Sequence, residues 1–186
     1  YATAGVTGVT PENVAAVNAQ VLAAETGGAA TTALIQVLAN TGAANAAEAV
    51  AAIEAYNNGD GTTPAAPTAE TYATAGVTGV TPENVAAVNA QVLAANPGEA
   101  NTVPEVQALA DAANTKADDA LAKIEAYAEN GDPTKAPTVE DYAAAGVTGV
   151  DAANLNATNA AVEAVTGVEA NTVPEVQALA DAANTK

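Results

Sequence analysis

The stretch EANTVPEVQALADAANTKADDALAKIEAYAEN, residues 99–130, decides the fold. Near its start, Thr102 and Glu105 have the spacing of a capping box. In that motif the Thr oxygen accepts the N3 amide, and the Glu carboxylate reaches back to the cap amide. Apolar residues then recur every three or four positions from Val106 to Tyr127, with no Gly or Pro between them. This pattern predicts a long amphipathic helix.

We expect this helix to run without a break from about Thr102 to Glu129. A rival signal lies inside it, because Thr115-Lys116-Ala117-Asp118 resembles a second capping box. That signal would break the helix at Asn114-Thr115. An unbroken helix would make the chain stiff, whereas a break would make it a flexible tether.

Outside this stretch the strongest feature is internal repetition. The sequence YATAGVTGVTPENVAAVNAQVLAA at 1–24 recurs without a change at 72–95, and a diverged version begins at Tyr142. We call these three stretches the first, second and third copies. EANTVPEVQALADAANTK at 99–116 also recurs unchanged, at 169–186. The copies begin 71 and then 70 residues apart, so the array arose by duplication.

Each copy carries its own helix signals. In the second copy, Thr81 is placed as an N-cap and Pro82 as the first residue of a helix to Ala95. A shorter helix precedes the third copy's loop: Thr138–Asp141 is a weaker capping box, and Gly146 suits the left-handed position that ends a helix. We interpret the following Val-Thr-Gly-Val as a tight connection, since it is too short for a strand and has no partner strand.

The composition removes most catalytic chemistry. The chain has no His and no Cys, so it lacks an imidazole base, a thiolate nucleophile and the usual zinc ligands. We expect no enzyme activity, no cofactor and no metal. With 22 acidic residues against 4 Lys and a net charge of -18, the surface repels nucleic acid and anionic membranes. No apolar run has the length of a membrane span, and no basic, apolar opening marks a signal peptide. We interpret the chain as a piece of a longer exported protein.

Two loops and two acid pairs are the candidate chemical sites. Asn57–Gly61 and Asn130–Asp132 faintly resemble calcium loops, but each holds one Asp where calcium needs six to eight oxygen ligands. We therefore favour helix ends with turn chemistry. Asp118-Asp119 and Glu140-Asp141 could do acid–base work if burial raised one pKa. We favour first-turn positions, where acids stabilise the helix dipole.

Repeated Tyr and Asn residues are the remaining candidates. A repeated aromatic could be a ligand platform, but we favour a core side chain with its hydroxyl at the rim. The residues are Tyr1, Tyr56, Tyr72, Tyr127 and Tyr142. Asn is a weak helix former, so Asn inside the predicted helices either binds a glycan or lies on a polar face. Both alternatives stay open for Asn84, Asn89, Asn154, Asn156 and Asn159.

AGVTGV, then a helix, then ANTVPEVQALADAANT resembles the GA module of bacterial surface proteins. The most specific match is TVPEVQAL at 102–109 and 172–179. The resemblance implies a left-handed three-helix bundle displayed in tandem at the cell surface. Some GA modules bind serum albumin through aromatic and Lys side chains of the second helix. The matching helix here, Pro82–Ala95, has neither, and albumin is itself acidic.

We therefore predict an all-α chain: a tandem array of small three-helix bundles joined by connector helices and Pro/Gly linkers. The predicted helical repeats are 1–43, 68–114 and 138–186, and the connectors with their linkers are 44–67 and 115–137. The expected function is a structural stalk or spacer of a secreted or surface-anchored bacterial adhesin, located outside the cell. Neighbouring repeats of the chain are the expected partners. The alternatives are a binding module for a host protein or glycan, through helices two and three of each repeat, and a subunit of an extracellular filament.

Overall fold

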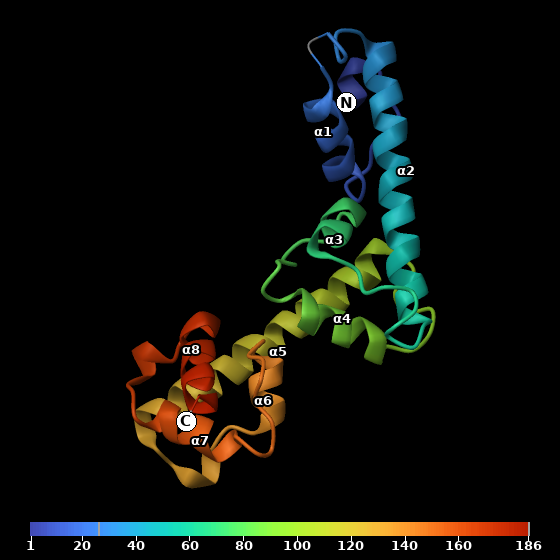
Figure 1. Ribbon diagram of the computed structural model, residues 1–186. Coiled ribbons are helices and arrows are strands. Elements are labelled where there is room, and N and C mark those ends of the chain that lie inside the picture. The colour runs from blue at the N-terminus through green and yellow to red at the C-terminus, as the bar shows by residue number, and fades with distance from the viewer. Residues whose placement is uncertain (26, 186) are drawn as a thin grey trace. The chain divides into compact units, whose positions relative to one another are not determined.

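The computed structural model describes residues 1–25 and 27–185, and all regular structure within them is helical (Figure 1). The all-α prediction is confirmed for these residues, which contain no strand. The α-helices are α1 (Val14–Ala23), α2 (Thr32–Asn57), α3 (Ala69–Ala75), α4 (Val85–Ala94), α5 (Val103–Asn130), α6 (Val139–Ala144), α7 (Leu155–Glu163) and α8 (Val173–Asn184). Three short 3-10 helices are η1 (Ala2–Ala4), η2 (Pro133–Lys135) and η3 (Gly167–Glu169).

The chain forms two compact units, residues 1–111 and 112–186, which we call the first and second units. The boundary falls within α5. In the first unit, Val6, Val17 and Ala39 form a core cluster, against which Val9 and Ile35 pack. The same unit includes contacts of α2 with α1, α3 and α4.

Helix α5 is unbroken through Asn114-Thr115, so the prediction of one long helix is confirmed. Its N-terminus has the predicted capping box: the Thr102 amide donates to Glu105 Oε2 at 3.1 Å, and the Glu105 amide donates to Thr102 Oγ1 at 3.4 Å. The rival signal fails because the apolar phase continues past it and is buried on both sides. Helix α2 is likewise continuous over 26 residues, although Gly42 lies within it.

The predicted start of α4 is wrong by three residues, since the helix begins at Val85 rather than Pro82. The cause is Asn84, whose Oδ1 accepts the Thr81 amide at 2.7 Å and whose Nδ2 donates to the Gly79 carbonyl at 2.8 Å. Such local side-chain bonds compete with helical hydrogen bonding. Residues 82–84 consequently form turns ahead of the helix.

The loop between α6 and α7 matches its prediction. Thr138 and Asp141 form the expected capping box at the start of α6. Gly146 has a positive φ of 86°, and the amide of Val147 then donates to the Tyr142 carbonyl at 2.9 Å. This bond turns the chain so that Val147 is buried in the core of the second unit.

The second halves of the long helices contribute core side chains. Ile53 and Tyr56 of α2 are 0% and 5% exposed, and Ile124 and Tyr127 of α5 belong to the core cluster of the second unit. That cluster joins α5 to α6, α7 and α8 through Tyr142, Val147, Val162, Val176 and Ala180, among others. These halves lie in the ranges 44–67 and 115–137, which were predicted to be connectors with their linkers. They contribute to cores because their apolar stripe is continuous with the preceding half of each helix and is buried.

Candidate functional site

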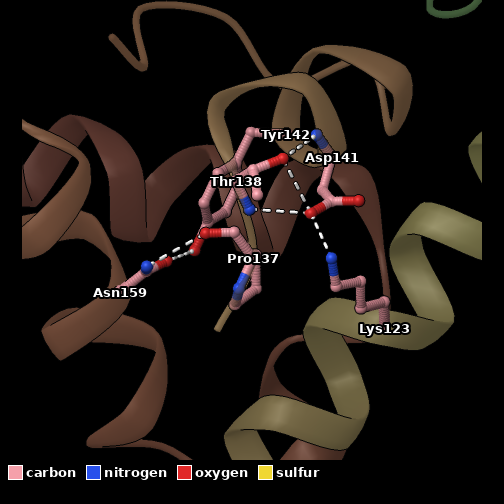
Figure 2. Close-up of polar contacts among 6 residues, drawn as sticks. All are labelled: Lys123, Pro137, Thr138, Asp141, Tyr142 and Asn159. Atoms are coloured by element: carbon pink, nitrogen blue, oxygen red, sulfur yellow. Dashed lines mark hydrogen bonds and ion pairs between the residues drawn. The ribbon is translucent and has the colours of Figure 1, made fainter. Parts of the chain in front are cut away.

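The repeated Tyr and Asn residues meet in a buried network, which Figure 2 shows for the third copy. Tyr142 is fully buried, and its hydroxyl donates to Asn159 Oδ1 at 2.7 Å. Asn159 Nδ2 in turn donates to the Pro137 carbonyl at 3.0 Å. Burial raises the pKa of Tyr142, so the hydroxyl remains a donor. We call this arrangement the Tyr–Asn–Pro network.

The second copy contains the same network. The Tyr72 hydroxyl donates to Asn89 Oδ1 at 2.7 Å, and Asn89 Nδ2 donates to the Pro67 carbonyl at 2.9 Å. The preference for core Tyr is confirmed for Tyr56, Tyr72, Tyr127 and Tyr142, which are all at most 6% exposed. It is wrong for Tyr1, which is 36% exposed. The hydroxyls of Tyr72 and Tyr142 are bonded inside the core rather than at its rim.

The structure gives the predicted Asn residues roles that the sequence analysis did not foresee. Asn89 and Asn159 are 7% and 8% exposed, so the polar-face interpretation is wrong for both. Asn84 and Asn154 close the loop that precedes their helix, through bonds to residues three and five positions earlier. Asn156 alone lies exposed on its helix.

A second repeated contact, between a Gln and a Thr, was not predicted from the sequence. Gln107 Oε1 accepts the Thr78 amide at 2.8 Å, and Gln107 Nε2 donates to the Thr78 carbonyl at 3.1 Å. One side-chain amide thus satisfies both backbone groups of one loop residue. The same pair of bonds joins Gln36 to Thr7 and Gln177 to Thr148. The signal was available, because each Gln follows its Thr by 29 residues in all three copies.

An ion pair lies beside the Tyr–Asn–Pro network of the third copy (Figure 2). Lys123 Nζ of α5 lies 2.5 Å from Asp141 Oδ2, and the Thr138 amide donates to the same oxygen at 2.7 Å. Burial raises the pKa of Asp141, but the hydrogen bonds from Lys123 and Thr138 outweigh it and leave the pKa below its usual value. The pair therefore fastens the start of α6 to α5.

The two loops proposed as faint calcium sites use their carboxylates for turns. Asp60 Oδ1 accepts from the Thr62 amide and hydroxyl and from the Thr63 amide, at 2.6 to 2.9 Å. These bonds lower the pKa of Asp60 to about 2. Asp132 accepts from the amide and hydroxyl of Thr134 in the same way. Both are the turn chemistry that the sequence analysis favoured.

The first-turn interpretation is confirmed for one acid pair and wrong for the other. Glu140 and Asp141 lie in the first turn of α6, as expected. Asp118 and Asp119 lie in the interior of α5, so the first-turn explanation is wrong for them. The reason is that the rival capping signal at Thr115 does not start a new helix, because α5 runs from Val103 to Asn130 without a break.

One surface depression of the second unit gathers polar groups, lined by Lys123, Ala126, Tyr127, Asn130, Asp132 and Lys135. Its charged groups have partners nearby: Lys123 pairs with Asp141, and Lys135 Nζ lies 3.9 Å from Asp132 Oδ2. The Tyr127 hydroxyl donates weakly to Glu163 at 3.4 Å. Over residues 1–25 and 27–185, no group of three or more acids is arranged to hold a metal ion.

Comparisons with protein families, with curated proteins and with solved structures find no match for this chain. Among the described helices, none is both long and apolar enough to cross a membrane.

Proposed function

We propose that this chain is a non-enzymatic tandem array of helical repeats that acts as a structural spacer, as in the stalk of a secreted or surface-anchored bacterial adhesin. One observation carries the proposal: the Tyr, Asn, Gln and Thr residues that recur in every copy form hydrogen bonds within that copy. The Gln–Thr and Tyr–Asn bonds are present in all three copies, with nearly the same lengths. A duplicated ligand site would instead repeat polar groups that point outward.

The array that we propose consists of GA-like bundles, in which the second and third copies each receive a fourth helical segment from the long helix before them. Tyr72 and Tyr142 support this, since each packs in a core that also contains the end of α2 or α5. The acidic composition supports a surface role, because a net charge of -18 favours solubility.

The alternative, a module that binds a host protein or glycan, is favoured by one observation. Leu34 and Val37 of α2 are 43% and 61% exposed, on the helix equivalent to the third helix of a GA module. The corresponding positions 71 residues later are Glu105 and Ala108. Because the apolar pair is not repeated, a multivalent binder gains nothing from the other copies, and the spacer explains the duplication better.

Deletion of one full period tests the modular array. Removing residues 72–141 joins Thr71 to Tyr142. This keeps the repeat in phase, because Thr71 directly precedes the second copy and Tyr142 begins the third. We expect the shortened chain to keep the same helicity per residue by circular dichroism and a cooperative thermal transition. Loss of helicity would show that the copies do not fold as interchangeable modules, and the spacer proposal would fail.

A direct binding measurement separates the two functions. We expect the immobilised chain to show no response to serum albumin, or to a panel of host glycans, at micromolar concentrations. Saturable binding that is abolished by Leu34→Glu and Val37→Ala, the residues of the second period, would establish the binding module instead. Thr41→Ala, at another exposed position of α2, is the control for non-specific effects.

A further inference from the structure

One sequence occurs in two environments within the first unit. The first and second copies are identical over 24 residues, yet Leu22 is 88% exposed while its equivalent, Leu93, is half-buried. Tyr1 is 36% exposed and Tyr72 is fully buried. Three more positions follow the same trend: Ala4, Asn18 and Val21 are less buried than Ala75, Asn89 and Val92. Since the sequences are the same, the difference arises from what covers them.

The second copy is covered by the end of α2 and the loop after it (Figure 1). Asn57, the last residue of α2, donates from Nδ2 to the Val92 and Ala95 carbonyls at 2.8 and 3.2 Å. Its Oδ1 accepts the Gly98 amide at 3.1 Å. The first two bonds cap the C-terminus of α4, and the third holds the loop that follows it.

The loop after α2 completes the cover. Gly61 lies so close to Leu93 that a Cβ there would be 2.7 Å from Leu93 Cδ2. Farther along, the Pro67 carbonyl accepts Asn89 Nδ2. The second unit shows the same arrangement independently, because Glu129 near the end of α5 accepts the Gly167 amide at 2.7 Å and Pro137 accepts Asn159. A helix end followed by a Pro-containing loop thus covers both the second and the third copy.

We propose that the exposed face of the first copy, formed by Tyr1, Ala4, Asn18, Val21 and Leu22, is a docking site for a helix and loop of the kind that residues 46–67 form. This occupant matches the face in chemistry. Its Ile and Tyr, equivalent to Ile53 and Tyr56, cover the apolar positions. Its terminal Asn caps α1 as Asn57 caps α4, and its Pro carbonyl accepts Asn18 as Pro67 accepts Asn89.

Docking of one repeat on the next would join the repeats whether or not the array acts as a spacer. The face selects another repeat of this type, since its sequence is the one that already binds such a segment in the second copy. The same rule makes the array directional, because each copy receives a segment from the repeat before it.

The test adds a copy of residues 43–71 directly before Tyr1 and follows the reactivity of a single thiol. The chain has no Cys, so Leu22→Cys and Leu93→Cys each provide a unique reporter at the same sequence position of two copies. In the unextended chain we expect the L22C thiol to react faster with a disulfide reagent than the L93C thiol. The extension should slow the L22C thiol about tenfold, toward the L93C rate, because reaction then requires local opening.

The control is an extension in which the residues copied from Ile53 and Tyr56 are both changed to Ala. This altered extension should leave the L22C rate nearly unchanged. An unaltered extension that does not slow the thiol would overturn the proposal. Equal slowing by both extensions would also overturn it, because it would show that any attached chain covers the face.

Discussion

Replacing Asn159 by Ala removes the centre of the Tyr–Asn–Pro network. The change leaves the Tyr142 hydroxyl without its acceptor and the Pro137 carbonyl without its donor. Each buried group left unpaired costs roughly 1–3 kcal/mol. Ala is a better helix former than Asn by up to about 0.7 kcal/mol, which offsets part of the loss. Taking about 1.5–2 kcal/mol for each of the two groups and subtracting the gain in helix propensity, we expect Asn159→Ala to destabilise the second unit by about 2–3 kcal/mol.

Hydrogen exchange followed by mass spectrometry measures this effect in the second unit alone, because residues 142–165 differ in sequence from the other copies. The loss corresponds to roughly 30- to 150-fold faster exchange of the amides that open with the core. Asn156→Ala is the matched control, since Asn156 is exposed on the same helix. It should change exchange little or slow it. Equal effects of the two substitutions would refute the structural role that we assign to Asn159.

Three further predictions concern packing, pH and salt. Gly42→Ala should lower the melting temperature, because the new Cβ would lie 2.5 Å from Val17 Cα. Overpacking lowers the free energy of unfolding by about 1–3 kcal/mol, whereas the better helix propensity of Ala raises it by ~1 kcal/mol. Thr41→Ala, on the exposed side of α2, should be nearly neutral, and a stabilised Gly42→Ala variant would show that α1 and α2 are not closely packed. The pKa of Asp60 is about 2 in the folded chain, below its unfolded value, so its contribution is present above about pH 4 and is lost as pH falls toward 2. Asp60→Asn should reduce the loss of stability over that interval, and an unchanged pH profile would contradict the turn bonds. Since 22 acids face 4 Lys, the melting temperature should rise with NaCl up to at least ~0.1 M, where screening acts over ~10 Å; a fall would contradict dominant like-charge repulsion.

The helical content was predictable because its signals are local. The capping boxes at Thr102 and Thr138 and the left-handed Gly146 depend on residues within one turn, and all three are present. The continuity of α5 followed from its apolar phase. Continuous burial along a stripe is stronger evidence than a single capping signal, because each buried position adds free energy.

Long-range partners were not predictable from local patterns. Asn89 and Asn159 have the composition of a polar face, and only the position of a Tyr 17 residues earlier makes them core residues. The Gln–Thr contact could have been found by comparing the copies, since Gln36 is retained where its neighbours differ from those of Gln107. The start of α4 was misplaced because Asn84 competes for the backbone bonds that a helix start at Pro82 would need.

The central claim, that the chain is a modular spacer, is tested most directly by the length of longer arrays. Residues 72–141 form one period, so one and then two further copies can be inserted after Asp141 without changing the phase of the repeat. Small-angle X-ray scattering then gives the maximum dimension of each monomeric array. The spacer account predicts a similar increase for each added copy. A maximum dimension that stays nearly constant, with the copies collapsing onto one another, would contradict it.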